Sequence, residues 1–255
     1  MIQNILKDKS TKLFIVLGCF FIANALIAEV IGVKIFSLEK TLGFEPFSFK
    51  LLGESGLSFS LTAGVLLWPV VFVMTDIINE YYGQKGVRFL SFIAVVLISY
   101  AFIAFTSAIQ LTAPDWWLAS SKNVPNLQNA YVAVLGQSNW IIVGSLIAFL
   151  VGQIVDVFVF HKIKKATGEK GIWLRSTGST LVSQLIDSYI VLMVAFYWGA
   201  DWSFQKVLAI GTVNYIYKFS MAIVLTPVIY GVHNIIEKYL GHEQARAMKN
   251  AAMEK

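Results

Sequence analysis

The chain has 255 residues, 57% of them apolar and only 14% charged, with a formal net charge of +5 and a mean hydropathy of +0.68. Soluble globular proteins are roughly one quarter charged, so this composition excludes a soluble fold, and it also excludes disordered, collagen-like and disulfide-stapled chains. Cys19 is the only cysteine, and His161, His233 and His242 are scattered, so we expect no disulfide, no metal site and no cofactor.

Six apolar runs follow one another along the chain, each long enough to form the helix of ~20 residues that crosses a bilayer. They cover residues 13–36, 57–81, 87–110, 139–160, 176–199 and 207–232. The connections between them are too short for a soluble catalytic domain. We therefore predict an all-α fold, a polytopic integral membrane bundle of six transmembrane helices, in which residues 1–255 form a single membrane domain.

Most basic residues flank these runs on one side. If the six runs cross in alternation, 14 of the 20 basic residues lie on the side of both termini, and Lys34 and Lys218 lie inside runs. The 14 are Lys7, Lys9, Lys12, Lys85, Arg88, Lys162, Lys164, Lys165, Lys170, Arg175, Lys238, Arg246, Lys249 and Lys255. Because Lys and Arg accumulate on the cytoplasmic face, both termini are predicted to be cytoplasmic. The positive charge is thus a topology signal, and no nucleic-acid partner is expected.

The first run also has the outline of a cleavable signal peptide. Lys7, Lys9 and Lys12 precede an apolar core, and the small residues Ala23 and Ala25 could mark a cleavage site. The apolar run continues as far as residue 36, which favours a retained span over a short signal core.

Polar side chains interrupt five of the six runs. An ionisable group at the centre of a bilayer costs about 2.5–3.5 kcal/mol, so such residues usually face a cavity or a partner. Many of them are three or four residues apart, which places them on one face of a helix. The residues that we expect to converge on a midplane substrate pocket are Asn24, Asp76, Gln153, Asp156, Gln184, Asp187, Asn214 and Lys218.

A purely structural interpretation competes with this pocket. Lys218 could pair with Asp187 or Asp156 only to neutralise charge between helices, and the carboxamides could join helices by hydrogen bonds. Asp76 and Glu80 stand near the cytoplasmic end of their run, where a carboxylate could simply be solvated. A shared pocket is preferred because so many runs carry polar groups where apolar ones would pack equally well.

Other features predict packing. Gly144, Ala148 and Gly152 recur every fourth residue and form a small-residue stripe for close helix approach, either within the bundle or in a homodimer. Pro69 and Pro227 lie inside apolar runs, where we expect each to kink its helix.

Four ordered motifs extend this picture. The chain resembles the queuosine precursor transporter family, also called the YhhQ or vitamin uptake transporter family. The resemblance rests on Pro69-x-x-Phe72-x-x-Thr75-Asp76 with Glu80-x-Tyr82-Gly83, Gly152-Gln153-x-x-Asp156-x-x-x-Phe160, Ser179-Thr180-Leu181 leading to Asp187-Ser188, and Tyr215-x-x-Lys218 followed by Thr226-Pro227-x-x-Tyr230. It implies a multi-pass protein of the bacterial plasma (inner) membrane that imports 7-cyano-7-deazaguanine or 7-aminomethyl-7-deazaguanine, precursors of the tRNA base queuosine.

The polar residues suit such a substrate. A guanine-like edge offers adjacent N–H donors that one carboxylate can accept, while its carbonyl requires an amide or ammonium donor. We expect Asp156 and Asp187 to accept from the donor edge, and Gln153, Gln184 and Asn24 to orient the ring. Lys218 would balance charge or donate to the ring oxygen, and alternating access would open the pocket to each side in turn.

Two other functions compete with this importer. The chain could be the substrate-binding subunit of a vitamin or nucleobase importer driven by a separate ATPase, since it carries no nucleotide-binding motif of its own. An intramembrane enzyme is disfavoured, because no Gly-x-Gly-Asp stretch, serine-protease base or HExxH motif accompanies the aspartates. We therefore expect no catalytic residue.

Overall fold

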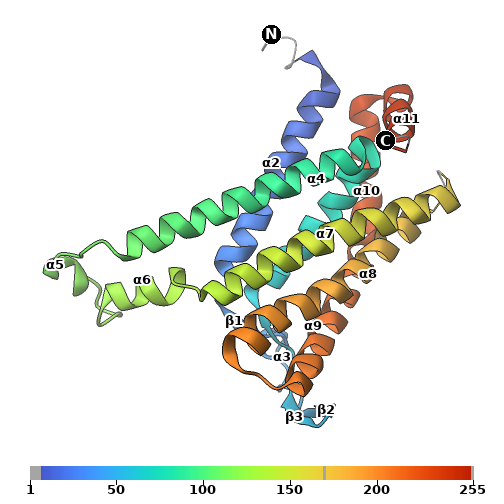
Figure 1. Cartoon of the computed structure of the whole chain (residues 1–255). Coiled ribbons are helices and arrows are strands. Elements are labelled where there is room, and N and C mark those ends of the chain that lie inside the picture. Colours follow the sequence, from blue (N-terminus) through green and yellow to red (C-terminus); the bar gives the residue numbers. More distant parts are fainter. Residues whose placement is uncertain (1–6, 169–170, 254–255) are drawn as a thin grey trace.

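The computed structural model describes residues 7–168 and 171–253, so Lys170 and Lys255 of the basic set lie outside the described residues. The described chain is mainly helical (Figure 1). Its helices are α2 (Lys9–Ile31), α3 (Leu38–Thr41), α4 (Trp68–Ile109), α5 (Asp115–Leu118), α6 (Leu127–Leu135), α7 (Asn139–Thr167), α8 (Ile172–Leu192), α9 (Phe204–Val224), α10 (Thr226–Leu240) and α11 (His242–Ala251), with a 3-10 turn η1 (Ala63–Leu66) and a π-helical segment η2 (Met193–Trp198).

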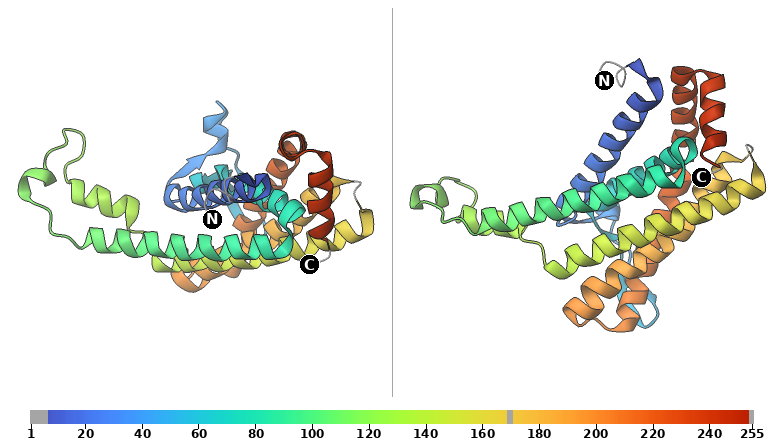
Figure 2. Two further views of the ribbon diagram at one scale, coloured as in Figure 1. Left: turned by 90° about the horizontal axis from the view of Figure 1, so that it is seen from above. Right: turned by 45° about the horizontal axis from the view of Figure 1, so that its top comes forward.

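Five helices of the described residues are long and apolar enough to cross a membrane, as in a multi-pass membrane protein. They cover Lys9–Ile31, Trp68–Ile109, Leu127–Thr167, Ile172–Trp198 and Phe204–Val224. The number differs from the six predicted runs because α4 contains two of them. In both views of Figure 2 the second part of α4 runs beside α7.

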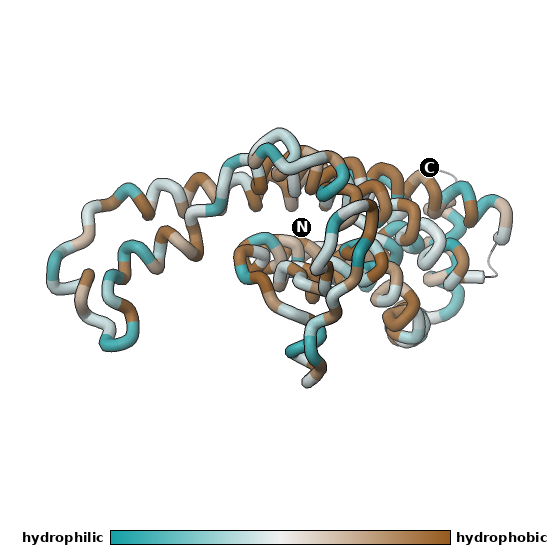
Figure 3. Tube along the Cα trace, turned by 90° about the horizontal axis from the view of Figure 1, so that it is seen from below, coloured by the Kyte–Doolittle hydropathy of each residue, from teal (hydrophilic) through white to brown (hydrophobic). Residues whose placement is uncertain are grey.

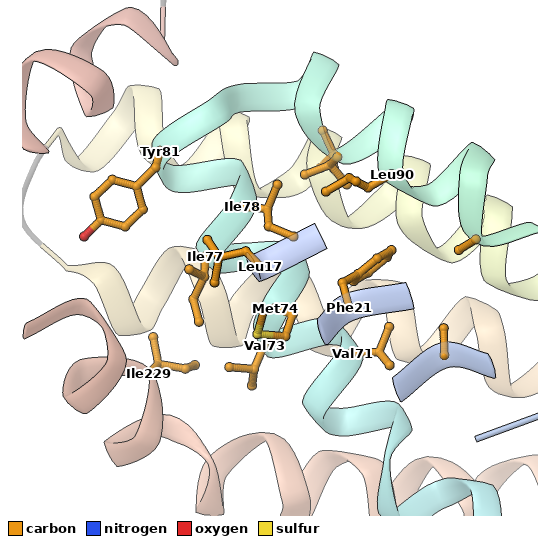
Figure 4. Packing of buried hydrophobic residues seen from close by; sticks show 14 of the residues in the cluster. Leu17, Phe21, Val71, Val73, Met74, Ile77, Ile78, Tyr81, Leu90 and Ile229 are labelled. Carbon is orange, nitrogen blue, oxygen red and sulfur yellow. The ribbon is translucent and has the colours of Figure 1, made fainter. Parts of the chain in front are cut away.

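Gly83 divides α4 into two helical segments. Its backbone has φ 70° and ψ −175°, a conformation that is essentially restricted to glycine. Figure 4 shows the ribbon passing Met74 and Ile77, then turning after Tyr81 toward Leu90. A Cβ at Gly83 would lie 3.1 Å from the carbonyl oxygen of Ala252, so the C-terminal segment packs directly against this turn. The second and third apolar runs therefore meet at a single glycine instead of a loop.

The fold is not purely α-helical, which corrects the all-α prediction. Strand β1 (Ile35–Ser37) pairs antiparallel with β4 (Ser60–Thr62), and β2 (Phe49–Leu51) pairs antiparallel with β3 (Glu54–Leu57). The sequence Leu-Ser-Phe-Ser-Leu-Thr over residues 57–62 alternates apolar and polar side chains, which is the period of a strand. The second helix consequently begins at Trp68 and not at residue 57.

The prediction of a kink holds for only one of the two prolines. Pro69 lies in the first turn of α4, where its missing N–H leaves no bond unmade, so the prediction that it kinks a helix is wrong. Pro227 does mark a break within its apolar run, because α9 ends at Val224 and α10 begins at Thr226. Both prolines thus begin a helix in the interior of an apolar run.

The bundle has a buried apolar core and an apolar outer surface. Leu17, Phe21 and Ile77 are among the residues that pack α2 against the first part of α4 (Figure 4). Large apolar side chains such as Phe92 and Phe158 point outward, and Figure 3 shows that apolar residues predominate along the long helices. An exposed apolar surface of this extent fits a protein surrounded by lipid.

The start of α2 and the helix α11 lie at one end of the bundle (Figure 1). Lys9 Nζ donates to the carbonyl oxygen of Tyr239 at 2.9 Å, and the Tyr82 hydroxyl donates to that of Ser10 at 2.7 Å. These bonds join the start of α2 to α10 and to the turn at Gly83. We call this end the terminal end and the opposite end, which carries the strands, the strand end.

The small-residue stripe of α7 is used for packing within the chain. A Cβ at Gly144 would lie 3.2 Å from the backbone nitrogen of Ala195 and 3.3 Å from the carbonyl oxygen of Val191. α7 therefore approaches α8 and η2 closely, as the stripe predicts.

Candidate functional site

One face of α8 carries a row of buried polar side chains. Serine, threonine, glutamine and aspartate recur at spacings of three and four residues, which aligns them along the helix. They are Ser176, Ser179, Thr180, Ser183, Gln184 and Asp187. All except Asp187 are buried. Because α8 packs against both α7 and α9, this face connects the polar residues of the other helices.

Asp76 of α4 is held by hydroxyl groups of α8. Its carboxyl is 1% exposed and accepts hydrogen bonds from Ser176, from Ser179 at 3.4 Å and from Thr180 at 3.3 Å. These groups are neutral donors, so they solvate the carboxyl without neutralising its charge.

Asp156 of α7 lies against Asp76. Ser183 donates to its Oδ1 at 3.0 Å, and its side chain is completely buried. The carboxyl groups of Asp156 and Asp76 face each other across the contact of α4, α7 and α8. No hydrogen-bond partner for Asp156 Oδ2 is found among the described residues.

Gln153 extends the same polar cluster by one turn of α7. Its Oε1 accepts hydrogen bonds from Thr75 at 2.9 Å and from Ser91 at 3.4 Å, so it ties together both segments of α4. Its Nε2 is buried without a hydrogen-bond partner in the described part of the chain.

Lys218 of α9 forms an ion pair with Asp187 of α8. The Nζ and Oδ2 atoms are 2.5 Å apart, and the side chains are 9% and 16% exposed. Gly152 of α7 adjoins this pair, since a Cβ there would lie 3.6 Å from Asp187 Cβ. α7 therefore packs in van der Waals range of the ion pair at position 152.

A small pocket, with room for about one water molecule in this conformation, lies between α4, α8, α9 and α10. Its lining combines apolar side chains with a few hydrogen-bonding groups, as ligand pockets do. It is lined by Pro69, Val73, Thr177, Thr180, Gln184, Lys218, Ala222, Leu225 and Ile229. Gln184 Nε2 is buried and has no hydrogen-bond partner in the described structure. The pocket wall thus offers an ammonium, an amide and two hydroxyl groups.

The predicted site residues separate into three groups. Gln184 and Lys218 line the pocket, and Asp187 reaches it through its ion pair with Lys218. Asp76, Gln153 and Asp156 form the buried cluster described above. Thr180 joins this cluster to the pocket, because it lines the pocket and its hydroxyl donates a hydrogen bond to Asp76.

Asn24 and Asn214 belong to neither assembly. Asn24 Nδ2 donates to the carbonyl oxygen of Phe20 in its own helix at 2.8 Å. Asn214 is half-buried one turn before Lys218 and is not among the residues that line the pocket. Both positions face other parts of the bundle, because a spacing of four residues on one helix does not fix which neighbour a side chain meets.

A second charged assembly, of Glu80, Lys164 and Arg175, is missing from the sequence-based site. Glu80 lies 3.0 Å from Lys164 Nζ and 2.7 Å from an Arg175 guanidinium nitrogen, and all three side chains are buried. A solvated Glu80 is therefore the wrong interpretation. The spacing of Glu80 from Asp76 placed it on the same face, but nothing in the sequence shows that two flanking cations turn inward to meet it.

The hydroxyl groups of α8 were also missed as site residues. Their signal is the recurrence of Ser and Thr at positions 176, 179, 180 and 183, which share one helical face with Gln184 and Asp187.

Residues 62–232 match the family model described as "Putative vitamin uptake transporter".

Three curated relatives are 26–30% identical to the chain over the aligned part of each. A "Probable queuosine precursor transporter" of Bacillus subtilis (strain 168) is 30% identical over 187 residues, which are 70% of this chain and 75% of the relative. The protein of the same name in Haemophilus influenzae is 26% identical over 73% of this chain and 76% of its own length. The "Queuosine precursor transporter" of Escherichia coli (strain K12) is 28% identical over 71% and 76%, respectively. No solved structure matches the chain significantly.

Proposed function

The chain belongs to the vitamin uptake transporter family, and from this premise we propose that it imports a queuosine precursor through the pocket between α4, α8, α9 and α10. The substrates are 7-cyano-7-deazaguanine and 7-aminomethyl-7-deazaguanine, and the membrane is the plasma (inner) membrane. Three relatives named as transporters of queuosine precursors support the substrate class.

The observation that carries this proposal is the unpartnered amide of Gln184 in the pocket wall. A buried polar group without a partner costs about 1–3 kcal/mol, so a ligand acceptor placed at Nε2 recovers that loss. Lys218 Nζ stands in the same wall and supplies a second, charged donor. Two donors facing one pocket suit the carbonyl and ring acceptor of a deazaguanine.

The donor edge of the substrate requires a carboxylate, and Asp187 is the one whose ion-pair partner lines the pocket. Its partner Lys218 lines the pocket, whereas Asp156 accepts its hydrogen bond from Ser183, which is not a lining residue. We therefore assign recognition of the ring N–H groups to Asp187. Lys218 pairs with the Asp187 carboxylate before substrate binds, and afterwards the carboxylate accepts hydrogen bonds from both Lys218 and the substrate.

Broken helices meet at this pocket. α4 begins at Trp68 after the 3-10 turn η1, and α10 begins at Thr226 after the break that follows α9. Pro69 and Leu225, at these two starts, both line the pocket. Transporters commonly bind substrate where discontinuous helices end, since these segments can move relative to the bundle. Alternating access would then move these starts against α8.

The proposed membrane topology treats the two segments of α4 as two separate crossings. Its two segments on either side of Gly83 give six crossings, which bring both termini to the same side, and the basic residues assign that side to the cytoplasm. Substrate would enter from the strand end and leave at the terminal end.

Uptake of labelled 7-deazaguanine precursor by cells unable to synthesise it tests the function. We expect uptake with the intact chain and its loss with Gln184→Ala, while Lys206→Ala, in the first turn of α9 and not among the residues that line the pocket, serves as a control. Transport by the purified chain alone in liposomes would separate this function from that of a subunit driven by an ATPase. Uptake that is unaffected by Gln184→Ala would contradict the assigned pocket.

A further inference from the structure

The two buried aspartates of the polar cluster have no cation of their own. Among the described residues, the ion pairs of the bundle interior use Lys164 and Arg175 for Glu80 and Lys218 for Asp187. Asp76 and Asp156 receive only hydroxyl donors. Two carboxylates in contact in a low-dielectric interior cannot both remain ionised without a counter-charge.

The hydrogen-bond count agrees with a shared proton. Asp76 accepts three hydrogen bonds, as expected for an ionised carboxylate. Asp156 accepts one at Oδ1, and its Oδ2 is buried with no partner in the described residues, while its carboxyl group lies against that of Asp76. A proton on this oxygen would supply the missing hydrogen bond between the two carboxyl groups.

The surrounding charges favour one net negative charge on the pair. Ser176, Ser179, Thr180 and Ser183 of α8 contact the pair directly. The other polar and charged groups on the surrounding helices are Thr75, Asn79 and Glu80 of α4, Gln153 and Lys164 of α7, Arg175 and Asp187 of α8, Lys218 of α9 and the Tyr81–His233 pair between α4 and α10. Glu80 with Lys164 and Arg175 carries a net charge of +1, one turn from Asp76. The ion pair of Asp187 and Lys218 is neutral. One ionised and one protonated carboxyl therefore balance the cluster.

From this geometry we infer that Asp76 and Asp156 bind the proton that drives import, a function that rests on the proposed transport activity. Thr180 is the link to substrate, because its hydroxyl donates to Asp76 at 3.3 Å and also lines the pocket. A second proton on the pair removes the charge that holds this hydroxyl, which then turns to the pocket and binds substrate. After the pocket opens to the cytoplasm, the proton leaves the pair to water and Thr180 returns to Asp76.

The test uses the full chain in phosphatidylethanolamine–phosphatidylglycerol vesicles with a pH indicator dye inside. Addition of labelled 7-cyano-7-deazaguanine should acidify the interior. For one proton per substrate, an inward gradient of one pH unit should concentrate substrate about tenfold, which is the ratio that one unit represents. In Asp156→Asn the ratio of gradient-driven accumulation to substrate exchange should fall about tenfold, while Glu237→Gln, a carboxylate outside the cluster, should keep the wild-type ratio.

A second readout does not depend on transport. The infrared absorption of the protonated carboxyl in this pair should appear as a component of the wild-type spectrum that Asp156→Asn lacks, and Asp156→Glu should restore it. Substrate exchange without acidification or accumulation would overturn the coupling and leave the transport function intact. A missing protonated-carboxyl band in a folded protein would overturn the proton site even if no substrate moves. Absence of both uptake and exchange, with the band present, would instead count against the proposed function and support the proton site.

Discussion

Lys218 of α9 donates to Asp187 of α8 across 2.5 Å at the edge of a pocket that Lys218 itself lines. Lys218 therefore both joins α9 to α8 and borders the pocket. The first prediction separates these two roles.

Lys218→Ala should abolish uptake and destabilise the protein. Removal of one partner from a buried ion pair costs about 3–5 kcal/mol, and less here because the Asp187 side chain is 16% exposed. The double variant Lys218→Met with Asp187→Leu removes both charges, so it should recover thermal stability in detergent while uptake stays absent. Recovery of uptake together with stability would show that the ion pair serves only to pack the helices and does not bind substrate.

Glu80→Gln should destabilise the bundle more than any other single loss of a carboxylate at the terminal end. It leaves Lys164 and Arg175 buried without a counter-charge, which costs about 3–5 kcal/mol. Thermal unfolding in detergent and the yield of monodisperse protein measure this effect. Glu237→Gln removes a more exposed carboxylate that also pairs with a lysine, and it should change the unfolding temperature little. Equal effects of the two variants would contradict the buried network.

Gly83→Ala should disturb the turn between the two segments of α4 and the packing of the C-terminal segment. The glycine-only backbone conformation costs another residue about 1–3 kcal/mol, and the added Cβ would press on the carbonyl oxygen of Ala252. We expect a lower unfolding temperature and faster proteolysis after α10. Gly231→Ala in α10 is the control, because a Cβ there meets no atom within 4 Å and the backbone is helical.

The strand end should loosen in acid through Glu39. Burial raises the pKa of Glu39, but hydrogen bonds from the Phe59 N–H at 2.7 Å and the Ser37 hydroxyl at 3.0 Å outweigh it and hold the pKa below its ordinary value of 4.5. The stabilisation is therefore present above the ordinary value and is lost as the pH falls through the lowered one.

Glu39→Gln measures this contribution. The wild type should unfold at a higher temperature than the variant at about pH 7, and the difference should disappear at about pH 3. A difference that persists in acid would show that the carboxylate charge does not matter.

The sequence determined the class of protein and the positions of most helices. Apolar runs fix where helices can cross lipid, since an unpaired backbone has no partner there. The sequence also supplied Gln184, Asp187 and Lys218, because polar groups in such runs are expensive and mark function. It could not place Asn24 and Asn214 away from the pocket, since helical spacing defines a face but not its neighbour.

Only the tertiary structure decided which charges meet. Residues 57–67 left the helix because alternating side chains and the pairing with β1 satisfy an extended backbone equally well. Lys164 and Arg175, which look like flanking charges in the sequence, turn inward to Glu80 and leave Asp76 and Asp156 with neutral donors only. Pairing among buried charges depends on distances between helices that are far apart in the chain, and a linear pattern contains no such distances.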